Sequence, residues 1–270
     1  MAQFKQMKPS SVDRENYILD KIFIAGDYQL KFARNDADLE EVLRLRFNVF
    51  NLELGEGLEE SYITHQDRDP YDTVCHHLMV VHRPTSKVIG TYRMQTQSMA
   101  NMGSGWYSAG EFDFSVMPSY ILDEGVELGR ACIDRDHRTS SALFLLWKGV
   151  AWYLIASGKR YLFGCSSINS QDPTEGNRTF TFLKQQGKIH PQVLLPARAD
   201  FNCGKPAEFD EQTLFVDIPK LFRAYMNYGS KVCSLPAIDR AFKTIDFLML
   251  FDLQELDPRV KQFFMWDFNL

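Results

Sequence analysis

The chain has 270 residues, of which 45% are hydrophobic and 24% are charged, a balance typical of a globular protein. The formal net charge of -5 and the absence of RNP, zinc-finger and basic-zipper patterns argue against a nucleic-acid-binding protein. No Pro/Gly/Ser-rich linker and no internal repeat divide the sequence. We therefore predict an N-terminal arm, residues 1–25, and a single domain, residues 26–270.

Five widely spaced cysteines with no CxxC pair indicate free thiols in a reducing cytosol rather than a disulfide framework. The N-terminal sequence MAQFKQMKPSSVDREN lacks the apolar core of a signal peptide. The most apolar predicted helix, residues 142–156, is too short to span a bilayer and contains Lys148. We expect a cytoplasmic protein, with peripheral contact at the inner membrane left open.

The first predicted strand is the alternating segment 28–33 (YQLKFA). Asn35 or Asp36 can cap the helix that follows, and Arg46 falls on the apolar face of that helix. A buried unpaired charge is costly, so this arginine needs a partner. Two interpretations stay open: a side chain whose charged end reaches water, or a guanidinium directed at a carboxylate in a pocket.

Residues 51–73 form a polar, acidic loop, and residues 75–82 and 87–95 form a predicted hairpin with Arg93 late in its second strand. Histidines and aspartates crowd one part of this region, but their spacing matches neither a zinc site nor an EF-hand. We therefore predict no metal site. The residues considered are His65, Asp67, Asp69, Asp72, His76 and His77.

The second half begins with a predicted strand, residues 126–133, followed by a helix that Thr139 or Ser140 can cap and by a buried strand, residues 160–166. Strand, helix and strand in this order make a βαβ unit with two parallel strands. Two more helices and two more strands follow. Their expected ranges are 176–186 (helix), 214–218 (strand), 219–229 (helix) and 244–251 (strand).

Glu127 and Arg130 are unusual in a strand that is otherwise apolar. Residues i and i+3 of a regular strand point to opposite faces, but Gly129 between them is typical of a bulge. A bulge would bring both side chains to one side and separate this strand from its parallel neighbour. A structural ion pair between Glu127 and Arg130 is the alternative interpretation.

The strand leads into Arg135, His137 and Arg138 and then a helix N-terminus, which favours a bound phosphate. Cysteine nucleophile chemistry at Cys132 or Cys165 is a weaker hypothesis, because a buried free cysteine usually only packs.

Several segments together resemble the GNAT acyltransferase superfamily, in the branch of autoinducer synthases and long-chain N-acyl amino acid synthases, and most of all its ornithine-lipid (hemolysin-like) N-acyltransferases. The resemblance runs from about residue 28 to residue 259. The segments that carry it are LRLRFNVFNLELG (with Arg46 and Phe50), DRDPYDTVCHHLMV (with Asp69, Asp72 and His77), IGTYRM (with Arg93), ELGR (with Glu127 and Arg130) and LPAIDRAFKTIDFLMLFDL.

The resemblance implies an α/β fold with a mixed, mostly antiparallel sheet, a splayed parallel strand pair and helices on both faces. It implies an enzyme that moves a long-chain fatty acyl group, 3-hydroxy chains included, from acyl carrier protein to the amine of an amino acid such as ornithine. An acyl-homoserine-lactone synthase and a lysolipid O-acyltransferase are enzymatic alternatives. A non-catalytic acyl-carrier or lipid-binding protein is the alternative from another class.

In this interpretation Glu127 is the general base, Arg130 orients Glu127 or the acceptor, and backbone N–H groups near Cys132 hold the oxyanion. Arg46 or Arg93 would bind the acceptor carboxylate, since arginine pairs with carboxylates in a bidentate manner. Asp69 or Asp72 would bind its amine, and the resemblance adds Phe50 to this acceptor group.

The loop RDHRTSSA has no glycine, so it fits the single phosphate of an acyl-phosphopantetheine arm better than the pyrophosphate of CoA. The expected donor residues are Arg135, Arg138, Thr139 and Ser140, and no tightly bound cofactor is expected. Acyl carrier protein is acidic and needs a basic patch, for which the candidates are Arg135, Arg138, Lys148, Lys159 and Arg160. The aromatic segment QFFMWDFNL at the C-terminus either completes the core or makes a membrane or dimer contact.

Overall fold

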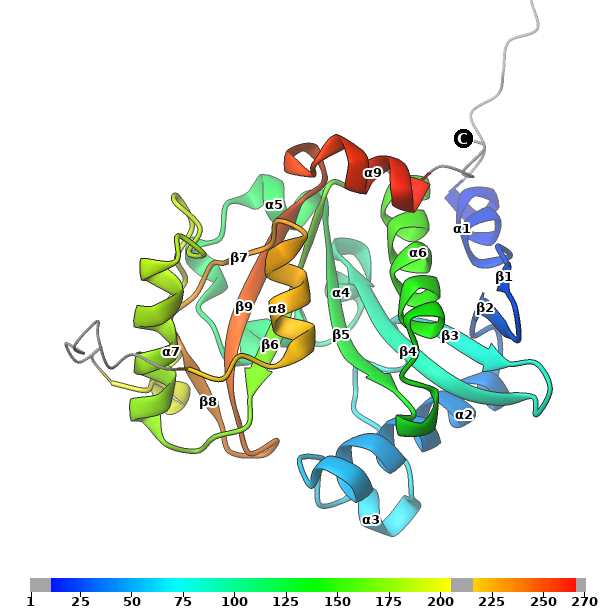
Figure 1. Ribbon diagram of the computed structural model, residues 1–270, viewed down its shortest axis with the longest axis horizontal. Coiled ribbons are helices and arrows are strands. Elements are labelled where there is room, and N and C mark those ends of the chain that lie inside the picture. Colours follow the sequence, from blue (N-terminus) through cyan, green and yellow to red (C-terminus); the bar gives the residue numbers. More distant parts are fainter. Residues whose placement is uncertain (1–10, 205–215, 266–270) are drawn as a thin grey trace, which may run out of the picture.

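The computed structural model describes residues 11–204 and 216–265, which form a mixed α/β fold around one sheet (Figure 1). Within these residues the strands follow the order β1-β2-β3-β4-β5-β6-β9-β7, and β8 also pairs with β9. All neighbouring strands are antiparallel except β5 and β6, which are parallel. The strands are β1 (Phe23–Ala25), β2 (Tyr28–Phe32), β3 (His76–His82), β4 (Lys87–Thr96), β5 (Gly125–Ile133), β6 (Tyr161–Ile168), β7 (Lys231–Val232), β8 (Ala237–Asp239) and β9 (Thr244–Asp252).

Helices cover both faces of this sheet. Helix α6 packs on the face that carries Tyr92 and Met94, whereas α2 packs on the opposite face, where its Arg46 meets Arg93 and the aspartates that both bind. The helices are α1 (Ser11–Leu19), α2 (Asp36–Phe47), α3 (Ser61–Thr64), α4 (Gln97–Met102), α5 (Ser119–Asp123), α6 (Ser140–Ala156), α7 (Pro173–Gln185), α8 (Lys220–Asn227) and α9 (Pro258–Met265). None of the helices in the described ranges is long and apolar enough to cross a membrane.

Local sequence accounts for the ends of the main helices. The Asn35 side chain accepts a hydrogen bond from the Asp38 backbone N–H and so caps α2, and Thr139 caps α6 through the N–H of Ala142. Gly158, just after α6, adopts a left-handed conformation with φ 71° that favours glycine. These caps confirm the expected starts of both helices.

Two other expectations need correction. The segment 51–73 is not simply a loop, because a π-helical turn, η1 (Asn48–Leu54), continues α2 and α3 follows it. Residues 216–218 of the expected strand at 214–218 are not in a strand, and its first two residues lie outside the described ranges. The last residues of the aromatic C-terminal segment, 266–270, lie outside them as well, while α9 packs on α6.

The expected N-terminal arm contributes to the core of the sheet. Ile18, Leu19 and Phe23 are buried in the same apolar cluster as α6 and strands β2–β5. The division of the chain at residue 25 remains a prediction, but the second half of the arm packs against the remainder.

Strand β5 carries the predicted bulge. Arg93 of β4 pairs with Gly129 and Thr91 pairs with Cys132, so Tyr92 alone faces two residues, Arg130 and Ala131. The bulge therefore lies one residue beyond Gly129, and Arg130 adopts a left-handed backbone with φ 50°.

Strands β5 and β6 separate beyond their first few residues. Their pairing covers residues 125–127 of β5 and residues 161–163 of β6, and the two strands diverge below that point in Figure 1. Where they part, the backbone of Gly164 lies so close to β5 that an added Cβ would be 2.1 Å from the Leu128 carbonyl oxygen. A residue without a side chain is required at this point.

We expect Gly164→Ala to destabilise the fold by about 1–3 kcal/mol, because the atom that the new methyl group meets belongs to backbone. Urea unfolding would measure the free energy of unfolding. Gly110→Ala is the matched control, since a Cβ there meets nothing within 4 Å. Equal stability of the two variants would contradict the close approach of β6 to β5.

Candidate active site

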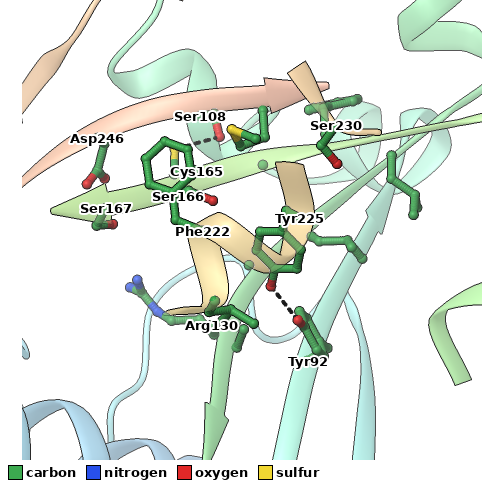
Figure 2. A pocket seen from close by; sticks show the side chains of 18 of the residues that line it. Tyr92, Ser108, Arg130, Cys165, Ser166, Ser167, Phe222, Tyr225, Ser230 and Asp246 are labelled. Atoms are coloured by element: carbon green, nitrogen blue, oxygen red, sulfur yellow. Dashed lines mark hydrogen bonds between the residues drawn. The ribbon is translucent and has the colours of Figure 1, made fainter. Parts of the chain in front are cut away.

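A cavity of about 600 Å³ opens where β5 and β6 separate (Figure 2). Consecutive residues of β6, Cys165 and Ser166, both line it, although neighbouring side chains of a strand point to opposite faces. The cavity therefore passes through the plane of the sheet. One side of it lies under α6 and α8, and the other side lies among the loops and polar groups of the opposite face.

The side of the cavity under α6 and α8 is mostly apolar and aromatic. A hydrogen bond between the hydroxyl groups of Tyr92 and Tyr225 joins α8 to the sheet across this space (Figure 2). The side chains that enclose it include Trp147, Val150, Leu154, Leu162, Phe222, Tyr225, Tyr228, Met249 and Phe251. This compartment has the character of a site for a flexible hydrocarbon chain.

On the opposite face, three arginines and three aspartates form a buried ion-pair network. Arg46 is fully buried, and its guanidinium bonds to Asp67 (Nε–Oδ2 2.7 Å) and to Asp72 (Nη1–Oδ1 2.6 Å). The interpretation in which the charged end of Arg46 reaches water is therefore wrong. The carboxylates that it faces belong to the protein itself.

The other two arginines complete the network. Arg93 bonds to Asp69 (Nη1–Oδ1 2.6 Å) and Asp72 (Nη1–Oδ1 2.9 Å), and Arg130 bonds to Asp69 (Nη2–Oδ2 3.0 Å). Burial alone would raise the pKa of Asp72, but the attraction of Arg46 and Arg93 outweighs it and holds the pKa below its ordinary value. Burial likewise raises the pKa of Asp69, and the attraction of Arg93 and Arg130 lowers it below its ordinary value.

Within this network, Arg130 is the member that lines the cavity. Its guanidinium donates to the Tyr107 hydroxyl (3.3 Å) and lies over the ring of Phe242, 4.2 Å from the ring centroid. Since Arg130 pairs with Asp67 and Asp69, a structural ion pair between Glu127 and Arg130 is ruled out. The bulge thus turns a cation from the ion-pair network toward the cavity.

Glu127 is buried behind the backbone of a short 3-10 helix, η2 (Tyr107–Gly110). Its two carboxylate oxygens accept the N–H groups of Tyr107 (2.8 Å) and Ser108 (2.7 Å). Burial raises the pKa of Glu127, and these hydrogen bonds oppose the rise. Tyr107 and Ser108 line the cavity, whereas Glu127 lies one layer behind them.

Cys132 lies outside the cavity. It packs against Leu45 and Val49, and burial raises the pKa of its thiol to about 12. The segment of β5 that faces the gap is residues 128–131. Cys132 itself is not part of this segment, and the oxyanion position expected near it stays a prediction. Phe50, from η1, does line the cavity.

The expected donor residues lie at the start of α6, near η4 (Arg135–His137), and do not line the cavity themselves. Arg138 pairs with Glu53 of η1 (Nη1–Oε1 2.7 Å), and the Thr139 hydroxyl is used as the helix cap. Arg135 is mostly exposed, and Ser140 opens the helix and is exposed.

The expected basic patch is not continuous. Lys148 is buried beside the ring of Phe23, 5.0 Å from its centroid. Lys159 and Arg160 lie at the other end of the 17-residue helix, about 25 Å from its start. Arg160 is also paired with Asp252. Arg135 and Arg138 remain as the candidate cations near the helix N-terminus.

Sequence analysis missed a second polar group at the cavity, the acidic cluster, which we define as Glu111, Asp239 and Asp246. Asp239 and Asp246 line the cavity beside Cys165, and the Cys165 thiol lies 4.0 Å from the Glu111 carboxylate. Burial raises the pKa of Asp246 to about 6 and that of Glu111 well above its ordinary value. One signal was present in the sequence: Asp246 interrupts the apolar strand TIDFLML.

Glu111, Cys165 and Asp246 bring their donor atoms within 4.8 Å of one another, so their geometry would admit a cation. This group is separate from the histidine-rich segment 65–77 weighed above. Burial raises the pKa of the Cys165 thiol well above its ordinary value.

Residues 45–148, which include the bulge and the start of α6, match the protein family described as Acetyltransferase (GNAT) domain. Over these residues the chain is similar to the GNAT acetyltransferases. The L-ornithine N(alpha)-acyltransferase of Rhizobium meliloti (strain 1021) is 26% identical over 250 residues, which cover 88% of this chain and 84% of that protein. The protein of the same name from Brucella abortus (strain 2308) is 27% identical over 248 residues, or 87% of each chain.

Solved GNAT-like structures also align with most of the chain. A CoA-dependent acyl-homoserine lactone synthase with SAM and isopentyl-CoA is 13% identical, with a TM-score of 0.47, and covers 85% of this chain and 82% of its own. An N-acyl amino acid synthase from uncultured soil microbes is 10% identical, with a TM-score of 0.47, and covers 87% and 97%.

We expect Arg46→Ala to lower the free energy of unfolding by about 3–5 kcal/mol, because it leaves buried carboxylates without their cation. The control is Arg44→Ala, two residues away on the same helix, whose exposed pairs with Glu40 and Glu41 should be worth less than about 1 kcal/mol. Denaturant unfolding of both variants would test this. A similar loss in both would mean that the network contributes no more than a surface pair.

Proposed function

We propose that this GNAT enzyme transfers a long-chain acyl group from the thioester of acyl carrier protein to the α-amine of ornithine, giving an N-acyl amino acid. The observation that carries this proposal is the cavity through the sheet, with an apolar compartment under α6 and α8 and with Arg130 and the acidic cluster on the opposite side. The names of the curated relatives support ornithine as the acceptor.

The acyl chain would occupy the apolar compartment. Trp147, Phe222 and Tyr225 offer it a deep aromatic surface that excludes water. The compartment continues past Met249 to Phe251 on β9, which suits a long chain better than an acetyl group. The thioester carbonyl would then lie at the gap between β5 and β6.

Arg130 would bind the acceptor carboxylate, because it is the network cation that faces the cavity. Arg46 and Arg93 would act indirectly. Arg46 binds Asp72, Arg93 binds both Asp69 and Asp72, and Asp69 in turn binds Arg130. In this proposal both aspartates are positioning residues, since their carboxylates are already engaged by arginines.

The chemical step is aminolysis of a thioester. The amine nitrogen attacks the carbonyl carbon, the C–N bond forms, the C–S bond breaks and the thiolate leaves with its electron pair. The amine proton passes to Glu127 through a relay at Ser108 or through water, since Glu127 lies behind the cavity wall. Backbone N–H groups of residues 128–131, released from pairing with β6, would stabilise the oxyanion.

The test is purified protein with acyl-carrier thioester and ornithine, with release of free thiol followed in time and the product identified by mass spectrometry. We expect Glu127→Gln to lower kcat by about 100-fold or more, in line with a general base, with little loss of donor binding. Exposed Glu124→Gln is the control and should keep full activity. Unaltered turnover in Glu127→Gln would remove Glu127 as the base.

Arg138 and the capped start of α6 would receive the phosphate of the phosphopantetheine arm. We expect Arg138→Glu to raise the KM for acyl-carrier thioester at least about tenfold, since it places a negative charge at an anion site. Lys87→Glu, which makes the same charge change at the exposed start of β4, should leave the KM unchanged. Equal KM values for the two variants would exclude this donor site.

Contact with a membrane surface stays a prediction. Apolar side chains of η1 and α3, such as Leu52 and Ile63, are exposed, and Leu54 of the same segment reaches the cavity. This placement would suit an enzyme whose product is a lipid.

A further inference from the structure

The acidic cluster is built by strand register at one end of the cavity. Asp246 of β9 pairs directly with Ser167 of β6, so its side chain lies on the same face as Cys165 and Ser167. Asp239 ends β8 opposite Thr244, and Glu111 follows η2. Residues of β6, of the β8–β9 hairpin and of the segment after η2 therefore converge on this point.

The cluster differs from the ion-pair network in lacking a cation. Each aspartate of the network contacts an arginine within 3.0 Å. By contrast, no lysine or arginine in the described ranges forms an ion pair with Glu111, Asp239 or Asp246. The carboxylate oxygens of Glu111 and Asp246 lie within 4.8 Å of each other, and each carboxyl has a raised pKa because it is buried.

One polar atom of the cluster lacks a hydrogen-bond partner. Asp246 is 6% exposed, and its Oδ1 atom makes no hydrogen bond. Asp246 lines the cavity, and Figure 2 shows it at the part of the cavity that also holds Ser167. A buried polar atom without a partner is costly, and a ligand that donates hydrogen bonds would remove that cost.

We infer that the acidic cluster binds a second, remote ammonium group of the acceptor, so that the site selects diamino acids over monoamino acids. This inference rests on the proposed function and extends it to the recognition of the acceptor side chain. An acceptor held by its carboxylate at Arg130 would place its far end in the same cavity as Asp246.

The chemistry of the cluster suits an ammonium group. A primary ammonium carries three donors, and the cluster offers carboxylate and hydroxyl oxygens to accept them. A divalent metal is the other occupant that the donor atoms of Glu111, Cys165 and Asp246 would admit. The two occupants are separable by experiment.

The experiment compares ornithine with norvaline, which has the same carbon skeleton but no side-chain amine. The kcat/KM for each amine is measured with acyl-carrier thioester in the wild type, in Asp246→Asn and in Asp36→Asn, an exposed aspartate in the first turn of α2. The ornithine to norvaline ratio within one preparation does not depend on the fraction of folded protein. Each assay is repeated after dialysis against a chelator.

We expect the wild type to prefer ornithine by about 100-fold or more, because a site with buried polar groups rejects a ligand that leaves them unpaired. Asp246→Asn should lower that ratio at least tenfold, while Asp36→Asn should preserve it. Equal kcat/KM values for the two amines in the wild type, or an unchanged ratio in Asp246→Asn, would overturn the inference while leaving N-acyl transfer intact.

Two further outcomes are distinct from these. Loss of selectivity on chelation would assign the cluster to a metal ion and would overturn the ammonium site. Absence of acylation with every amine would refute the proposed function itself, and the inference would fall with it.

Discussion

The loss of strand pairing between β5 and β6 is the constraint on which the rest of the site depends. The two strands pair only through residues 125–127 of β5, and the bulge at Arg130 and Ala131 then directs β5 away from β6. A sheet that stayed paired here would be filled by hydrogen bonds and side chains. Because it opens, a cavity can pass through the protein at its centre while both sides of the sheet keep their own packed cores.

The open part of the sheet lacks strand-to-strand hydrogen bonds, and the buried ion pairs connect the elements around it. Arg46 and Arg93 tie α2 and β4 to the segment that follows η1, and Arg130 ties the bulge to the same aspartates. Equal numbers of arginines and aspartates leave this region without net charge, which makes its burial tolerable. The acidic cluster across the cavity is not balanced in this way. The two polar groups therefore differ: one is neutralised by its own ion pairs, whereas the other has no cation partner in the described ranges.

Local patterns in the sequence predicted much of this fold. Asn35 and Thr139 marked the helix starts, and Gly129 within an apolar strand indicated the bulge that turns Arg130 toward the cavity. These features depend on residues close together in the chain. Arg46 was correctly recognised as needing a partner, but Asp67 could not be singled out, because the segment between them has no periodicity that fixes its path.

The residues that the sequence did not predict depend on the register of strands that are far apart in the chain. The approach of Asp246 to Ser167 follows from the pairing of β6 with β9, two strands far apart in the sequence. The prediction of a continuous basic patch was wrong for a different reason. Lys148 faces the interior, and Lys159 and Arg160 lie a whole helix length from Arg138. A count of cations along the chain cannot show which side or which end of a helix they occupy.

The V shape of the β5–β6 pair also affects how a product would leave. The strands are closed by hydrogen bonds at Gly125 and open at the other end. In the proposed function, the product would have its long chain on one side of the sheet and its charged head on the other. Such a molecule would leave sideways through the open end of the gap, with no need to pass lengthwise between the strands. An opening of this shape would admit two reactants from opposite faces and release their joined product as one piece.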